Sequence, residues 1–329
     1  MAVVKANAYG HGLDLIAPAL LDEGCLSFAV TDAAEGLRLR RMLGKKPDIV
    51  ILSGIFDRED AGLCREAGLT PIVSEPWQIN ILGNVSFAER VWLKVDTGMC
   101  RLGCEDVLQM FTTCREQDIH IAGIMSHLAC ADIPGHPLNR RQAEVLRQYL
   151  AALPEPVSVS LLNSAGLITM PEYVMDVVRP GIALYGAEPV RNHSLGLQPV
   201  MQLTSRIMQI RTVRKGESVS YGATFTAPKD MCIAIAALGY ADGLPRALSN
   251  CGMAIVANKQ GKDAILPVTG RVCMDYCLLD ASRVSLAAGD TVEFWGGAMP
   301  AVEVARQAGT IAYELFTGLG ERVMRKAVM

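Results

Sequence analysis

Lys5 is the first residue of the chain that could carry out chemistry. It follows a short apolar run, Ala2 to Val4, and precedes a glycine-bearing turn, Tyr9-Gly10-His11-Gly12. In α/β barrels the reacting groups stand at the carboxyl ends of parallel strands. The alternative is an ordinary solvated lysine, since most lysines are exposed. Position alone marks Lys5 as a candidate without deciding which chemistry it performs.

Further candidates follow later apolar runs in the same way. Lys94 ends the fifth run, and the loop after it contains Asp96 and Arg101, which could form a simple ion pair. His127 follows the sixth run, and a lone histidine is usually structural. Ser164 follows the seventh run. These residues become interesting only if the runs are neighbouring strands.

Arg179-Pro180-Gly181-Ile182 follows in the eighth run. Glycine lets backbone N–H groups approach a phosphate, and barrel phosphate sites commonly lie near strands seven and eight. Gly181 and Ile182 are therefore candidate phosphate ligands.

The elements that would position these residues alternate between apolar runs and amphipathic helical patterns. Eight strands are predicted: Ala2–Lys5, Ser27–Val30, Ile49–Leu52, Pro71–Ser74, Val91–Val95, Ile121–Ser126, Val157–Leu161 and Val177–Ala183. Strand–helix repetition implies a parallel sheet, and eight such units favour a closed (β/α)₈ TIM barrel. Periodicity leaves a doubly wound open sheet as the alternative.

The pattern changes after Gly196. Short strand-like runs such as Val200–Val213 and Cys232–Leu238 dominate, and no helical pattern returns until Ala301–Gln307. We therefore expect an α/β barrel in residues 1–197 and a mostly β domain in residues 198–329.

Composition narrows the possible classes of protein. The chain has 329 residues, half of them hydrophobic, with a net charge of −3 and a pI of about 6.0. The chain contains no block of basic residues of the kind that binds nucleic acid. It has no apolar run long enough to span a bilayer, and its first residues lack the layout of a signal peptide. The ten cysteines show neither Cys-x-x-Cys nor metal-ligand spacing. We predict a cytoplasmic protein with reduced thiols, no metal, no nucleic-acid partner and no membrane partner.

Six stretches together resemble the bacterial alanine racemases, which are pyridoxal-phosphate enzymes of fold type III. They are VVKANAYGHG from Val3, KVDTGMCRLG from Lys94, RPGIALYG from Arg179, SYGAT from Ser220, GYADG from Gly239 and GRVCMD from Gly270. The resemblance implies that L-alanine and D-alanine interconvert on a pyridoxal 5'-phosphate aldimine held by Lys5. It also implies a head-to-tail homodimer, in which Tyr221 and Met274 of one subunit reach Lys5 of the other.

The resemblance assigns a role to each matching residue. Lys5 and Tyr221 are the catalytic bases, supported by Arg101 and His127, and Lys94 is carbamylated and orients Arg101. His127 packs beside the cofactor ring and hydrogen-bonds the arginine below it. The cofactor-binding residues are Lys5, Tyr9, Ser164, Arg179, Gly181, Ile182 and Tyr313. Arg101 and Met274 bind the substrate.

Two of these roles have a physical rationale. Racemisation removes a proton from one face of Cα and returns it to the other, so it needs two bases. A phenol titrates near pH 10, so Tyr221 needs cationic neighbours, for which we expect Arg101 and His127. By resemblance Arg179 faces the pyridine nitrogen, and an arginine cannot accept that nitrogen's proton. A cofactor ring whose nitrogen is not protonated withdraws electrons more weakly, and this favours proton exchange over transamination or decarboxylation.

Several alternatives stay open at this point. A related racemase could act on serine or lysine, and a cofactor-binding protein without turnover would not need Tyr221. A barrel decarboxylase would place an acid where Arg179 stands. The resemblance also implies a strand and a helix before the lysine strand, so we expect the chain as given to lack that segment and to be less soluble and less active for it.

Overall fold

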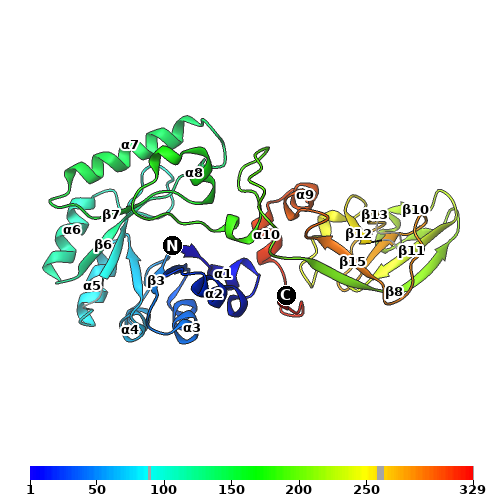
Figure 1. Cartoon of the computed structure of the whole chain (residues 1–329), viewed down its shortest axis with the longest axis horizontal. Helices are drawn as coiled ribbons and strands as arrows, with labels where there is room; N and C mark the ends of the chain where they lie inside the picture. The colour runs from blue at the N-terminus through cyan, green and yellow to red at the C-terminus, as the bar shows by residue number, and fades with distance from the viewer. Residues whose placement is uncertain (88–89, 258–262, 329) are drawn as a thin grey trace. The chain divides into compact units, whose positions relative to one another are not determined.

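The computed structural model describes residues 1–87, 90–257 and 263–328 (Figure 1). The chain divides into two compact units. The first unit consists of Met1–Ala8, Gly12–Leu184 and Glu188–Leu195. The second unit consists of Tyr9–His11, Tyr185–Ala187 and Gly196–Met329. Two short pieces that precede Gly196 therefore belong to the second unit.

The first unit is built on one parallel sheet. Its strands are β1 Ala2–Val3, β2 Ser27–Val30, β3 Asp48–Ile51, β4 Thr70–Val73, β5 Arg90–Lys94, β6 His120–Met125 and β7 Ser158–Ser160. They pair in chain order from β1 to β7. A doubly wound sheet would reverse its strand order at a switch point, so the sequential order is that of a barrel. The predicted TIM-barrel class is confirmed, with seven assigned strands.

The predicted eighth strand, Val177–Ala183, is not a regular strand, yet its first residues close the sheet. On one side the N–H of Val177 donates to Val159 and that of Arg179 to Leu162. On the other side the N–H of Val3 donates to Pro180 at 3.0 Å. Pro180 has no N–H to donate, and a 3-10 turn, η2 Ile182–Tyr185, begins two residues later. The run of hydrogen bonds along Val177–Ala183 is therefore too short to count as a strand. It still connects the segment of β7 on one side to β1 on the other.

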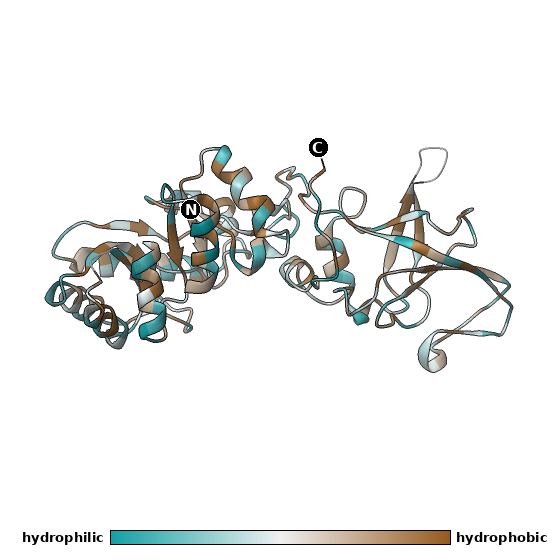
Figure 2. Cartoon of the chain, turned by 90° about the horizontal axis from the view of Figure 1, so that it is seen from below, coloured by the Kyte–Doolittle hydropathy of each residue, from teal (hydrophilic) through white to brown (hydrophobic). Residues whose placement is uncertain are grey.

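Helices cover the outside of this sheet. They are α2 Leu13–Asp22, α3 Ala33–Leu43, α4 Arg58–Ala67, α5 Pro76–Asn84, α6 Val107–Glu116, α7 Pro137–Ala152 and α8 Ser164–Thr169, followed by the short turn η1 Pro171–Tyr173. The element α1 Lys5–Tyr9 is a tight turn after β1 and is described with the site. Several begin at a capping carboxylate, such as Asp57 for α4 and Asp106 for α6. Hydrophobic and hydrophilic residues alternate along them (Figure 2). Buried residues recur along one face of α3 and of α6, and the strands β2 and β4 are almost wholly buried, as expected for a sheet that helices cover.

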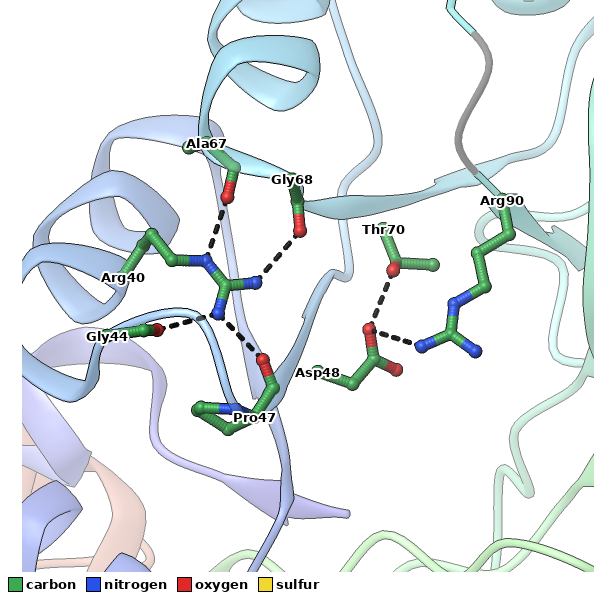
Figure 3. Close-up of polar contacts among 8 residues, drawn as sticks. All are labelled: Arg40, Gly44, Pro47, Asp48, Ala67, Gly68, Thr70 and Arg90. Atoms are coloured by element: carbon green, nitrogen blue, oxygen red, sulfur yellow. Dashed lines mark hydrogen bonds and ion pairs between the residues drawn. The ribbon is translucent and has the colours of Figure 1, made fainter.

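The amino ends of the strands are tied together by polar contacts (Figure 3). The guanidinium of Arg40 donates to the carbonyl oxygens of Gly44, Pro47, Ala67 and Gly68, each at 2.8 Å. These carbonyls belong to the segments that lead into β3 and β4. Beside them Asp48 accepts from Thr70 at 2.8 Å and pairs with Arg90 at 3.3 Å.

The second unit is dominated by antiparallel strands. They are β8 Leu203–Val213, β9 Ser218–Val219, β10 Phe225–Thr226, β11 Met231–Ala236, β12 Met253–Ala257, β13 Asp263–Pro267, β14 Cys277–Asp280 and β15 Thr291–Trp295. Six of them form a sheet in the order β13-β12-β15-β8-β11-β14, and β10 pairs with β9. The short helices are η3 Tyr221–Ala223, η4 Arg246–Leu248, α9 Ala301–Gln307 and α10 Ala312–Thr317. Burial alternates along the first half of β8, as expected for a sheet with one packed face.

The thiols and the helix lengths of the chain complete the description of its fold. All ten cysteines are free thiols, four of them buried. Among the described residues, no helix combines the length and the apolar character that crossing a membrane requires.

Candidate functional site

Lys5 stands at the start of an unusual piece of backbone. Ala6, Asn7, Ala8 and Tyr9 have φ values of 53°, 54°, 54° and 50°, so α1 is a left-handed turn. Each non-glycine residue in this conformation costs roughly 1–2 kcal/mol. The expected strand Ala2–Lys5 therefore ends at Val3, and the turn at its end begins with non-glycine residues.

Hydrogen bonds fix both ends of this turn. The N–H of Ala6 donates to Glu35 Oε1 at 2.7 Å, and that of Leu13 donates to Asn7 Oδ1 at 2.9 Å. The carbonyl oxygen of Asn7 accepts from Gly12 at 3.0 Å. The turn is thus held by its surroundings, and Lys5 is held with it.

Lys94 lies at the carboxyl end of β5 and is buried. Burial lowers its pKa well below the usual value, and Arg179 and Arg101 lower it further against the opposing effect of Asp96. The pKa of Lys5 is also lowered, by burial and then by Arg101, while Glu35 opposes the shift. Both amines are therefore biased toward their neutral, nucleophilic form.

The loop that carries Arg101 is organised by Asp96. Its carboxylate accepts from the N–H groups of Gly98 at 2.7 Å, Met99 at 2.9 Å and Arg101 at 3.2 Å. Burial acts to raise the pKa of Asp96, but these backbone donors together lower it. Asp96 therefore binds the backbone of Arg101, and within the described part of the chain it makes no side-chain ion pair with that residue. The simple ion-pair interpretation is wrong.

Arg179 is buried beneath the loops that follow β6 and β7. It donates to the Oγ atom of Ser160, to the carbonyl oxygen of Ser126 at 2.5 Å and to that of Leu161 at 3.1 Å. A longer contact of 3.4 Å joins it to His127 Nδ1. Burial lowers the pKa of Arg179 to about 10.

His127 is electrically neutral in this setting. Burial, then Arg179, Lys94, Arg101 and Lys5, lower its pKa to about 2. Our expectation that His127 supplies positive charge to Tyr221 is therefore wrong, because desolvation and the neighbouring basic groups, Arg179 first, disfavour an imidazolium at this position. Arg101 is left as the cation expected to act on the phenol.

Ser164 and the start of the 3-10 turn η2 lie together. The Oγ atom of Ser164 accepts from the N–H of Gly181 at 2.8 Å and from that of Ala183 at 3.3 Å. Ser164 begins α8, whose cap is Asn163. With both N–H groups directed at the oxygen, the Ser164 hydroxyl proton is available to another acceptor such as a phosphate oxygen.

The remaining predicted site residues belong to the second unit. The rings of Tyr9 and Tyr313 are 5.8 Å apart, and burial followed by Tyr313 raises the pKa of Tyr9. Tyr221 is 70% exposed on η3, and Met274 is 52% exposed in the loop before β14. The structure thus brings Lys5, Lys94, Arg101, His127, Arg179, Ser164, Gly181 and Ile182 into the first unit. It assigns Tyr9, Tyr313, Tyr221 and Met274 to the second.

Two residues of the site were missed by sequence reasoning. Gln142 of α7 is fully buried, accepts from the N–H of Ala129 and donates to the carbonyl of His127 at 2.9 Å. Glu35 contacts the turn after Lys5. Gln142 gives no signal in a helical pattern, whereas Glu35 stands three residues after Asp32, in a capping pattern that suggests only a helix start.

The positive charge is the main electrostatic feature of the first unit's site. Lys5, Lys94, Arg101 and Arg179 perturb one another or His127. Among the residues that the structure describes, none of the four forms an ion pair within 4.0 Å. Such a cluster is suited to bind an anion. Because a neutral lysine amine can add to a carbonyl carbon, the cluster is also suited to an anionic compound that carries a carbonyl group.

Comparison with known proteins gives one family. The profile of the alanine racemase N-terminal domain matches residues 1–189, and that of the C-terminal domain matches residues 200–327. A catabolic alanine racemase of Agrobacterium fabrum is 39% identical over 341 residues, covering 99% of this chain and 85% of that protein. An alanine racemase of Halorhodospira halophila is 39% identical, covering 100% and 90%.

Solved structures agree with the sequence relatives. The biosynthetic alanine racemase of Pseudomonas aeruginosa superposes with a TM-score of 0.91 at 37% identity, over 99% of this chain and 91% of that one. The alanine racemase of Bartonella henselae, which carries covalently bound pyridoxal phosphate, gives a TM-score of 0.89 at 34% identity, over 98% and 90%.

Proposed function

The chain belongs to the alanine racemase family and is an enzyme of the racemase class, and we propose that Lys5 holds pyridoxal 5'-phosphate while Lys5 and Tyr221 move the Cα proton of alanine. The observation that carries this proposal is the group of basic side chains, with Lys94 and Arg179 buried, that gathers with Lys5, whose pKa is lowered. Among the described residues these basic groups form no ion pair within 4.0 Å, so an anionic cofactor and an anionic amino acid would supply further negative charge.

The residues present fit the cofactor. Pyridoxal phosphate, when bound, acts as an electron sink that stabilises negative charge at the substrate's Cα. Lys5 would hold its carbonyl carbon, and Arg179 would face its ring nitrogen. The candidate phosphate ligands are Ser164, Gly181, Ile182, Tyr9 and Tyr313. Ser164 fits this role because its hydroxyl proton is available.

The two bases act on opposite faces of Cα. The neutral form of Lys5, favoured by its lowered pKa, accepts a proton from one enantiomer. Tyr221, contributed by the partner subunit of a head-to-tail homodimer, returns a proton on the other face. Arg101 stabilises the phenolate and, with Met274, contacts the substrate. His127 stays neutral and contributes packing and its contact to Arg179.

We also propose that Lys94 is carbamylated. Its amine is buried and biased toward the neutral form beside Arg101 and Arg179. Addition of the amine nitrogen to carbon dioxide, with loss of one proton, gives an anion that the two guanidiniums would stabilise. The carbamate would then orient Arg101. A ¹³C signal from labelled bicarbonate that disappears in Lys94→Ala is the expected result, and a wild-type protein without that signal would contradict it.

The broader context is part of the same proposal. We place the enzyme in the cytoplasm as a supplier of D-alanine for peptidoglycan, and we divide the chain into a barrel of residues 1–197 and a β domain of residues 198–329.

The two-base proposal is tested by Tyr221→Phe. Because each base serves the Cα proton of one enantiomer, this variant should lose racemisation by several orders of magnitude. Deuterium exchange into one enantiomer should nevertheless survive, because Lys5 is intact. The measurement is Cα deuterium uptake from D₂O, starting separately from L-alanine and from D-alanine. Equal residual exchange from both enantiomers would contradict the assignment.

A further inference from the structure

The carboxylate of Glu35 joins two segments of the first unit that are far apart in sequence. Its Oε2 atom accepts the N–H of Thr31 at 2.9 Å, just before α3. Its Oε1 atom accepts the N–H of Ala6 at 2.7 Å, one residue after Lys5. One half-buried side chain therefore connects the start of a helix to the backbone that carries the catalytic lysine.

Helix capping accounts for only one of these two contacts. Asp32 caps α3 by accepting the N–H of Glu35 at 2.8 Å, and Glu35 reaches back toward the residue before the cap. This arrangement is a variant of the capping box, which occupies one glutamate oxygen. The second oxygen is directed outside the helix, at Ala6.

The left-handed turn depends on such outside contacts. The first N–H groups of a helical turn have no partner within it, and here Glu35 satisfies that of Ala6. Four consecutive non-glycine residues with positive φ are costly, and such strained backbone persists only where its surroundings hold it. Glu35 is therefore well placed to determine where the Lys5 backbone lies.

Glu35 also differs in charge from the rest of the site. The charged groups that act on Lys5 are Arg101 and Glu35, and the neighbouring His127 is neutral. Arg101 favours the neutral amine, whereas Glu35 favours the ammonium. Glu35 is thus the carboxylate that balances the cations at Lys5.

We propose that Glu35 is a positioning residue of the racemase site, which fixes the left-handed turn carrying Lys5 and places a negative charge at the backbone of that turn. This inference rests on the proposed attachment of the cofactor to Lys5. It assigns Glu35 no contact with substrate or cofactor.

The test compares Glu35→Gln with Asp32→Asn. Both substitutions remove one carboxylate charge from the start of α3, but only Glu35 contacts Ala6. Glu35 uses a different oxygen for each of its two N–H donors, and glutamine replaces one of these oxygens by an NH₂ group that cannot accept, so one of the two contacts is lost. We expect Glu35→Gln to bind pyridoxal phosphate about tenfold more weakly, the effect of losing one hydrogen bond to a charged group. We also expect a lower pKa for Lys5, whereas Asp32→Asn should match the wild type in both.

Two readouts are needed besides activity. Cofactor titration followed by absorbance gives the dissociation constant, and the pH dependence of Lys5 acylation in the cofactor-free protein gives the pKa of its amine. Thermal unfolding of both variants separates these effects from loss of fold. Should Glu35→Gln not fold, Glu35→Asp keeps the charge but is shorter, and it should weaken cofactor binding while leaving the Lys5 pKa close to that of the wild type.

Failure of the proposed role of Glu35 and failure of the proposed cofactor attachment to Lys5 give different results. If Glu35→Gln and Asp32→Asn have the same cofactor affinity and the same Lys5 pKa, Glu35 only caps α3 and the inference is overturned. If the wild type itself does not attach pyridoxal phosphate to Lys5, the proposed function fails first.

Discussion

Arg40 and Arg179 bind main-chain carbonyls at opposite ends of the same parallel sheet, but their surroundings differ. Arg40 donates to four carbonyls at the ends of α3 and α4 and before β3, where helix dipoles place negative charge. Arg179 is buried among other cations and forms no ion pair in the described chain. At the amino end the guanidinium of Arg40 faces carbonyl oxygens, whereas at the carboxyl end the basic groups form no ion pair among the described residues, which favours the binding of an anion.

Loss of Lys5 is the strongest test of that difference. Lys5→Ala should abolish racemisation in both directions, because it removes one base and the cofactor's attachment. Lys46→Ala, an exposed lysine in the loop that Arg40 holds, should leave activity unchanged. Racemisation of L-alanine and of D-alanine by both variants is the measurement. Substantial activity in Lys5→Ala would show that the cationic end is not where the reaction occurs.

Arg179→Glu tests the role of the buried guanidinium. Racemisation should fall by about 100-fold, the usual effect of removing a preorganised electrostatic group. A carboxylate facing the ring nitrogen would also let that nitrogen keep a proton, so a transamination side reaction should increase. Pyruvate formation per racemisation event measures the change. An unaltered ratio would show that Arg179 has the same structural role as Arg40.

His127 gives the carboxyl end a pH dependence that the amino end lacks. Its pKa is about 2 in the folded protein and about 6.5 in an unfolded chain. Between these values the unfolded state binds the extra proton, so stability rises with pH and is lost as pH falls below about 6.5. His127→Asn should reduce the slope of unfolding free energy against pH by up to roughly 1.4 kcal/mol per pH unit in this window. Denaturant titrations that give the same slope would contradict a neutral His127.

Arg40→Lys should have the smallest effect on activity. A lysine cannot reproduce the planar fork that reaches four carbonyls, so we expect a loss of about 2 kcal/mol in unfolding free energy. Turnover should stay within a factor of two of the wild type, because the change lies at the amino ends of the strands. A large loss of turnover in a variant that is still folded would show that the two ends of the sheet are coupled.

Much of the fold was readable from the sequence because local patterns and the final packing agree. Apolar runs separated by amphipathic stretches predicted β2 at its observed bounds and β3, β5 and β6 to within one residue. The eighth run was different, because Pro180 and the 3-10 turn that follows interrupt its ladder. Periodicity measures burial, and Val177–Ala183 is partly buried without being a regular strand.

The site was less predictable, because its properties depend on contacts between distant segments. Motif resemblance identified candidates such as Lys5 and Arg179. It gave no indication that Ala6 to Tyr9 wind left-handed, since none of them is a glycine. The neutral state of His127 and the second contact of Glu35 arise only when several strand ends meet. Chain topology, and not any single motif, creates the charge of the site.

The most direct measurement of the central claim is chemical mapping of the cofactor. The protein is loaded with pyridoxal phosphate, reduced with borohydride and digested, and the modified peptide is identified by mass spectrometry. We predict a single modified residue, Lys5, at the start of the left-handed turn. Reduced cofactor on Lys94 or on any other lysine, or no modification at all, would contradict the claim that the cationic carboxyl end of the barrel is the racemase site.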